Sequence, residues 1–148
     1  MSMSRSRNSR LPPCPWLLLV VFLVSEFPSN SYADVGTSAR YAPPYLPTTC
    51  YGGEATQFPS SNLFAAAGDG IWDNGAACGR QYLVRCVSAE QPRTCIPDQS
   101  IQVKIVDYAS SAVSAASAPS TTLVLSDKAF ATIANTSAAL INIEFQQV

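Results

Sequence analysis

Residues 100–108 read SIQVKIVDY, and this stretch decides the class of fold. Apolar Ile101, Val103 and Ile105 alternate with polar Gln102 and Lys104. Successive side chains of a strand point to opposite faces, so a period of two predicts a half-buried β-strand. Similar β-rich patterns occur in three other stretches: residues 77–86 (ACGRQYLVRC), 121–125 (TTLVL) and 140–145 (LINIEF).

One short helix is expected between the last two of these strands. Ser126 is a candidate N-cap, and Asp127 places a carboxylate in the first turn, near the positive end of the helix dipole. Asn135 is a plausible helix end. Helical spacing is carried by four apolar residues: Ala129, Phe130, Ile133 and Ala134. Several strands with one late helix predict an all-β barrel with a helix appended.

The N-terminus has the pattern of a secretory signal peptide. Arg5, Arg7 and Arg10 precede an apolar run at residues 16–24 (WLLLVVFLV), which is too short to span a bilayer. Small residues at Ser31 and Ala33 fit cleavage after Ala33. We therefore expect residues 1–33 to be a signal peptide and residues 34–148 to form one secreted domain. The alternative is an uncleaved amphipathic anchor.

Cysteine usage agrees with export. The sequence has five cysteines, and Cys14 would leave with the signal peptide. The four that remain, Cys50, Cys78, Cys86 and Cys95, are an even number, which is typical of a disulfide framework in an exported chain. Four cysteines allow three connectivities, and the spacing alone does not choose among them.

Charge and histidine content exclude several classes of function. The formal net charge is -1 and only 13% of residues are charged, so the chain lacks the basic excess that binding a nucleic acid requires. There is no histidine, which excludes Ser-His-Asp and Cys-His catalysis and histidine-containing zinc sites. We expect no metal, no cofactor, and no transmembrane segment in the mature chain.

Two segments are predicted to be loops. Pro43-Pro44, Pro47 and Gly52-Gly53 make the early part of the domain turn-rich. Residues 109–120 (ASSAVSAASAPS) are rich in Ala and Ser and lack apolar periodicity, so we expect a mobile surface loop.

The chain resembles the plant natriuretic peptides, which are secreted expansin-like proteins with an endoglucanase-like domain. The most specific matching block is GIWDNGAACGR at residues 70–80. The other blocks follow in order along the domain: Gly36-Thr37, Tyr41, Pro43-Pro44-Tyr45, Cys50-Tyr51-Gly52, residues 64–67 (FAAA), Tyr82, Val84-Arg85-Cys86, residues 103–108 (VKIVDY), Leu125-Ser126, residues 129–131 (AFA), Ile133-Ala134 and Gln147-Val148.

The resemblance implies a six-stranded double-psi β-barrel. It also implies that Cys50 pairs with Cys78 and Cys86 with Cys95. Relatives usually carry a further cysteine pair after the Val-Asp-Tyr block, whereas this chain has Ala109 at the first of those positions.

The resemblance also bears on catalysis. Asp107 occupies the place of one acidic residue of expansins and related hydrolases. The second acid belongs to a His-Phe-Asp triplet in expansins, where this chain reads Thr122-Leu123-Val124. Glycoside hydrolysis normally needs two carboxylates, so we expect no catalytic residue and no enzyme activity.

Three residues are candidate contacts for a polysaccharide, each with a structural alternative. Asp107 is either a polar contact in a groove or a strand-end carboxylate that binds backbone N–H groups. Trp72 and Tyr41 form either an aromatic platform for a sugar or part of the core. Asp73, in an Asp-Asn-Gly sequence, is interpreted as a turn residue. Asn135-Thr136-Ser137 is a glycosylation sequon, unless Asn135 only caps the helix.

Three functions are compatible with these residues. The resemblance implies a signalling protein of the apoplast that acts on water and solute balance through a cell-surface receptor. We expect it to be a monomer. The contact would fall within residues 43–72, with Pro44, Tyr45, Tyr51 and Phe64 as candidates, unless this segment is only a turn-rich connection. The alternatives are a non-catalytic, expansin-like binder of cell-wall polysaccharide and a small defence or inhibitor protein.

Overall fold

The computed structural model describes residues 33–114 and 120–148. The expected signal peptide, except for residue 33, lies outside the described residues. So do residues 115–119 of the Ala/Ser-rich segment.

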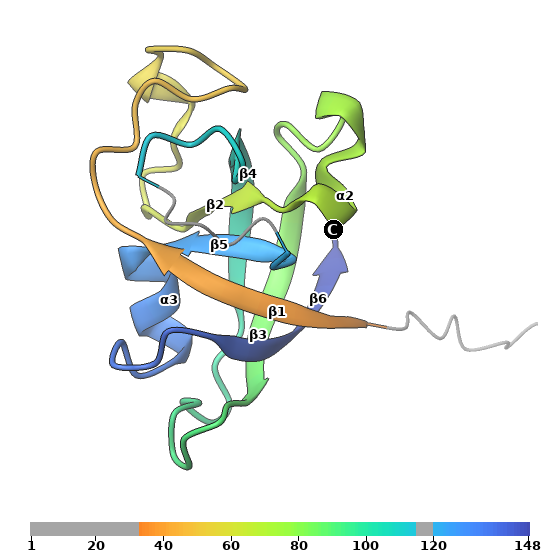
Figure 1. The fold of residues 1–148 in the computed structure, drawn as a ribbon, viewed down its shortest axis with the longest axis vertical. Helices are drawn as coiled ribbons and strands as arrows, with labels where there is room; N and C mark the ends of the chain where they lie inside the picture. Colours follow the sequence, from red (N-terminus) through yellow and green to blue (C-terminus); the bar gives the residue numbers. More distant parts are fainter. Residues whose placement is uncertain (1–32, 115–119) are drawn as a thin grey trace, which may run out of the picture. The chain divides into compact units, whose positions relative to one another are not determined.

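Six strands close into a barrel in the order β1-β5-β2-β4-β3-β6 (Figure 1). The pairs β1–β5 and β2–β4 are parallel, and the other four neighbouring pairs are antiparallel. The expected six-stranded double-psi barrel is therefore confirmed. The strands are β1 (Asp34–Tyr41), β2 (Phe64–Ala67), β3 (Gln81–Ser88), β4 (Ile101–Tyr108), β5 (Leu123–Ser126) and β6 (Ile141–Gln147).

The four strands that the sequence patterns predict are β3, β4, β5 and β6. Strands β1 and β2 do not follow from periodicity. All four residues of β2 are buried, so no polar positions alternate with its alanines. In β1 the buried positions include Ser38, which a hydrophobic pattern does not mark as interior.

Helix α3 (Asp127–Ile133) begins as predicted, because the Ser126 hydroxyl accepts the N–H of Ala129 at 3.2 Å. It ends two residues before the expected Asn135. Phe130 and Ile133 are fully buried and fix the helix against the barrel.

The described residues also contain short helical segments that the sequence did not indicate: α2 (Asp69–Trp72), η1 (Ala55–Gln57) and η2 (Asp73–Gly75). Gly68 permits the close approach that places α2, because a Cβ there would lie 1.7 Å from the carbonyl oxygen of Thr121. Asp73 is a turn residue as expected, with a left-handed φ of 54°.

The buried side chains form two clusters. The larger fills the barrel and includes Val84, Ile105, Leu123 and Phe130. The smaller cluster is separate from the one inside the barrel and contains Tyr41, Phe64, Ala66, Val106, Ala109 and Val124. Ala109, which replaces an expected cysteine, is thus buried in the smaller cluster.

Candidate functional site

Residues 42–63, which connect β1 to β2, form a segment that we call the lobe. Figure 1 shows it at one end of the barrel, with the β3–β4 connection at the other. A disulfide from Cys50 to Cys78 joins the lobe to the turn before β3, with a Cα–Cα distance of 5.5 Å. A second disulfide joins Cys86 to Cys95. These are the two pairs that the resemblance implies.

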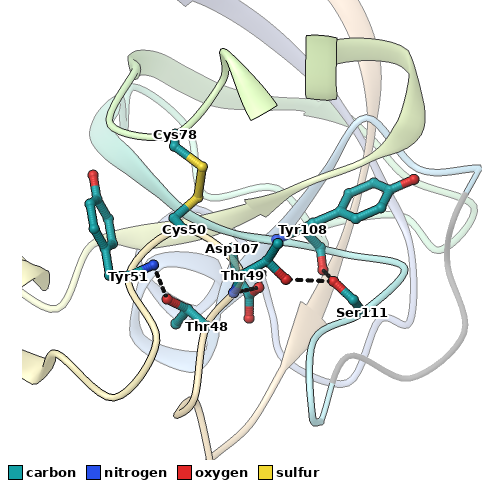
Figure 2. Close-up of a disulfide and its surroundings, with 8 residues drawn as sticks. All are labelled: Thr48, Thr49, Cys50, Tyr51, Cys78, Asp107, Tyr108 and Ser111. Atoms are coloured by element: carbon teal, nitrogen blue, oxygen red, sulfur yellow. Dashed lines mark hydrogen bonds between the residues drawn. A yellow bond between two sulfur atoms is a disulfide. The ribbon is translucent and has the colours of Figure 1, made fainter. Parts of the chain in front are cut away.

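Asp107 holds the lobe to the end of β4. Its side chain is 1% exposed, and its Oδ1 accepts the N–H of Thr49 at 2.9 Å and the N–H of Tyr108 at 2.8 Å (Figure 2). Asp107 is therefore a strand-end carboxylate that binds backbone N–H groups, which is the second of its two expected roles. Its position offers no exposed carboxylate to a sugar.

The environment of Asp107 changes its acidity. Burial raises the pKa of this carboxyl, and the hydrogen bonds from Thr49 and Tyr108 partly oppose that shift. Its Oδ2 is buried without a hydrogen-bond partner within the described residues. A buried acceptor without a partner costs free energy when it is charged, so burial favours the protonated form.

The expected position of a second acid lies in the same row of the sheet as Asp107. Ala66 of β2 pairs with Asp107 on one side and with Val124 on the other. Val124 is buried and apolar. Thr122, at the histidine position of the expansin triplet, accepts the N–H of Thr37 at 3.1 Å through Oγ1. This row therefore pairs one buried carboxylate with an aliphatic side chain.

Two of the candidate contacts are interior residues. Tyr41 is 3% exposed, which agrees with its core alternative, and Phe64 is 2% exposed, so its ring is not available at the surface as a receptor contact. Their rings pack together with Tyr45, whose centroid lies 4.9 Å from that of Tyr41 and 4.7 Å from that of Phe64. Burial, followed by the nearby Asp107, raises the pKa of Tyr41 well above its usual value.

The lobe presents the remaining candidates at its surface. Pro44 is exposed, and Tyr45 and Tyr51 are half-buried. Tyr51 is held in place by Lys104, whose Nζ lies 5.1 Å from the ring centroid. The same Nζ donates to the backbone oxygen of Gln57 at 2.9 Å. One lysine of β4 thus contacts two parts of the lobe.

An open groove with a volume of about 680 Å³ lies beside α2. Its aromatic wall is Trp72 stacked on Tyr108, with ring centroids 4.4 Å apart and an interplanar angle of 16°. The Tyr108 hydroxyl donates to the Asp69 carboxylate, which also accepts the hydroxyl of Ser110 at 3.1 Å. Trp72 is half-buried.

Ionic side chains complete this groove. Arg80 pairs with Asp73 at 2.6 Å on its lining. Trp72 is a candidate contact from the sequence alone, whereas its neighbours Tyr108, Asp69 and Arg80 become visible only in the structure. The adjacency of Tyr108 to Asp107 was the available signal, since consecutive residues at a strand end face opposite sides.

The described ranges contain no group of three or more His, Cys, Asp or Glu side chains that would hold a metal ion. Within residues 33–114 and 120–148, no helix is long and apolar enough to cross a membrane.

The closed barrel, with its strand order, defines a double-psi β-barrel protein. Residues 64–145 match a double-psi β-barrel family model, DPBB_1, described as lytic transglycolase. An EG45-like domain containing protein of Citrus jambhiri is 36% identical, over 88% of this chain and 94% of its own length. A putative EG45-like domain containing protein 1 of Arabidopsis thaliana is 40% identical, over 86% and 90%. The chain belongs to this family of EG45-like domain containing proteins.

Solved structures show the same fold. An apo expansin of Clavibacter michiganensis is similar with a TM-score of 0.55 and 18% identity, over 79% of this chain and 50% of the expansin. A mutant of that expansin in complex with cellohexaose gives a TM-score of 0.57 at the same identity and coverage. The chain thus spans half the length of these expansins.

Proposed function

We propose that this protein is a secreted, non-hydrolytic signalling protein of the apoplast that acts as a monomer on water and solute balance through a cell-surface receptor. The lobe is its contact surface. The observation that carries the proposal is the use of Asp107: the buried carboxylate binds the Thr49 N–H and fastens the lobe, where a hydrolase would present it to substrate.

A fastened lobe is suited to recognition. The disulfide from Cys50, the bond to Asp107 and the contacts of Lys104 hold it at separate points. A segment that is already ordered loses little conformational entropy when it binds, so its exposed side chains contribute more of their contact energy to affinity. Pro44, Tyr45 and Tyr51 are the residues of the lobe that we assign to the receptor.

The same row of the sheet supports the part of the proposal that excludes hydrolysis. General acid–base cleavage of a glycosidic bond uses two carboxylates separated by about 5–9.5 Å. Val124 supplies no proton donor or acceptor across Ala66 from Asp107. The proposal therefore includes no release of reducing sugar from wall polysaccharides.

The test compares two matched aromatic truncations in a protoplast-swelling assay. Tyr51→Ala alters the lobe and Trp72→Ala alters the groove; both residues are half-buried in the folded protein. We expect swelling with the wild type and with Trp72→Ala, and loss of swelling with Tyr51→Ala. Circular dichroism checks that both variants fold. Swelling that survives Tyr51→Ala and fails with Trp72→Ala would assign the response to the groove.

The groove supports a second candidate, an expansin-like binding of cell-wall polysaccharide without cleavage. Its stacked Trp72 and Tyr108 provide an aromatic wall, and Asp69, Asp73 and Arg80 provide polar groups for hydroxyls. Retention on insoluble cellulose and xylan tests it. Strong retention that Trp72→Ala abolishes, with no cell response to the wild type, would replace the first function by this one.

A further inference from the structure

We propose that Asn135 carries an N-linked glycan. The sequence places Ser137 two positions after it, with Thr136 between, and no other asparagine of the chain has Ser or Thr at that spacing. The inference rests on the export included in the proposed function. It concerns a surface that neither the lobe nor the groove uses.

The structure removes the alternative that Asn135 caps the helix. Helix α3 ends at Ile133, and the N–H of Ala134 already bonds to Phe130. Asn135 follows in a turn, where its backbone N–H donates to the oxygen of Thr94 at 2.8 Å and its backbone oxygen accepts from Ala138 at 3.2 Å. The main chain at Asn135 is therefore fixed without any helical role for its side chain.

The side-chain amide is presented for modification. Its Oδ1 accepts the N–H of Ser137 at 3.0 Å, which orients the amide group. No hydrogen bond to its Nδ2 is present within the described ranges, and residues 135–137 are all exposed. A glycan on Nδ2 would therefore break no contact of the described fold.

The modification is a group transfer with a defined balance. The Asn135 Nδ2 attacks the anomeric carbon of an oligosaccharide carried on a lipid diphosphate. A C–N bond forms, the bond from that carbon to the diphosphate oxygen breaks, and the lipid diphosphate leaves. The diphosphate keeps the electron pair of the broken bond, and the proton lost by the amide nitrogen passes to the solvent. The co-reactant is the lipid-linked oligosaccharide of the secretory compartment, and glycosylated asparagines lie in surface loops of exported proteins.

The location leaves both proposed binding surfaces free. Ala134 forms a bridge with Cys95, and the N–H of Asn135 donates to Thr94, so Asn135 lies beside the β3–β4 connection. Figure 1 shows this connection at the end of the barrel opposite the lobe. It is also absent from the residues that line the groove beside α2. A glycan here would add polar surface to a chain with few charged residues without blocking either face.

The test expresses the full chain in plant cells and reads two quantities separately: the protein in the medium, and a mobility shift removed by peptide N-glycosidase. We expect a single shift in the wild type and in Ser137→Thr, and none in Asn135→Gln or Ser137→Ala. Ser137→Ala keeps the backbone N–H that holds the turn, so it separates the sequon from the local fold. Mass spectrometry after glycan release should find aspartate at position 135.

Secreted protein without the shift would overturn the glycan and leave the proposed export intact. Protein retained in the cell with the shift would support the glycan and contradict export. Retained protein with no shift would overturn both.

Discussion

Asp107 and Tyr108 are consecutive residues at the end of β4, but they contact different regions of the molecule. Asp107 faces the lobe, is 1% exposed and accepts a hydrogen bond from Thr49 of the lobe. Tyr108 faces outward, stacks on Trp72 and lines an open groove. One strand end thus holds the lobe on one side and forms an aromatic wall on the other. The contact between Asp107 and the lobe is therefore closed to solvent, whereas the groove beside Tyr108 is open to a ligand.

The largest expected effect comes from unfastening the lobe. Replacing Cys50 and Cys78 together with serine should lower the free energy of unfolding by roughly 2–4 kcal/mol, because the bridge restricts the unfolded chain. Urea unfolding followed by fluorescence measures it. The control removes Cys86 and Cys95, whose sequence separation is 9 rather than 28. That loss should be about 1 kcal/mol smaller, since a shorter loop is closed. Equal losses of unfolding free energy would show that the Cys50–Cys78 disulfide does not stabilise the fold more than the Cys86–Cys95 disulfide.

Asp107→Ala should be next in size. It leaves the N–H groups of Thr49 and Tyr108 without their acceptor, which costs roughly 1–3 kcal/mol of unfolding free energy. Asp107→Asn keeps an oxygen acceptor at nearly the same volume and should lose less. Equal stability of wild type and Asp107→Ala in urea unfolding would show that Asp107 does not fasten the lobe.

Trp72→Ala tests whether the groove can be altered without disturbing the lobe. The loss of the stacked pair with Tyr108 should cost about 0.5–1.5 kcal/mol beyond the loss of buried area. The lobe should keep its order, because no lobe residue lines this groove. Nuclear magnetic resonance spectra of the variant should show shifts near α2 and Tyr108 and none at Thr49. Shifts throughout the lobe would contradict the separation of the two regions.

The smallest expected effect is a pH dependence at Asp107. Its folded pKa lies above the ordinary value of 3.8, because burial disfavours the charged form. The folded state then holds the proton more tightly than the unfolded state, so the stabilising contribution is present below the unfolded pKa and is lost as pH rises through the folded pKa. Asp107→Asn lacks this titration. We expect wild type to lose stability relative to Asp107→Asn as pH is raised from about 3 to 7. A difference that stays constant or runs the other way would contradict the raised pKa.

The fold was largely predictable and the site only in part. Alternation marks β4 because one of its faces is covered, and a hydroxyl before an apolar helical pattern marks Ser126 as a cap. Strand β2 is invisible to the same reasoning, because burial on both faces removes the period of two. Phe64 was misjudged because it begins β2, the strand that periodicity does not reveal, whereas for Tyr41 the core alternative is the one that the structure supports.

The groove depended on chain segments that are distant in sequence. Asp69 and Tyr108 are 39 residues apart, and only the pairing of β2 with β4 brings them together. The sequence resemblance located Asp107 and the missing second acid. The direction of the Asp107 side chain, toward the lobe and away from the groove, required the structure.

Amide hydrogen exchange at Thr49 shows directly whether Asp107 holds the lobe to the barrel. Thr49 is itself exposed, so protection of its N–H depends on the bond to Asp107. We predict that this amide exchanges slowly in the wild type and in Asp107→Asn, and that Asp107→Ala loses the protection. Exchange at the rate of a free loop in the wild type, or protection that survives Asp107→Ala, would contradict the account.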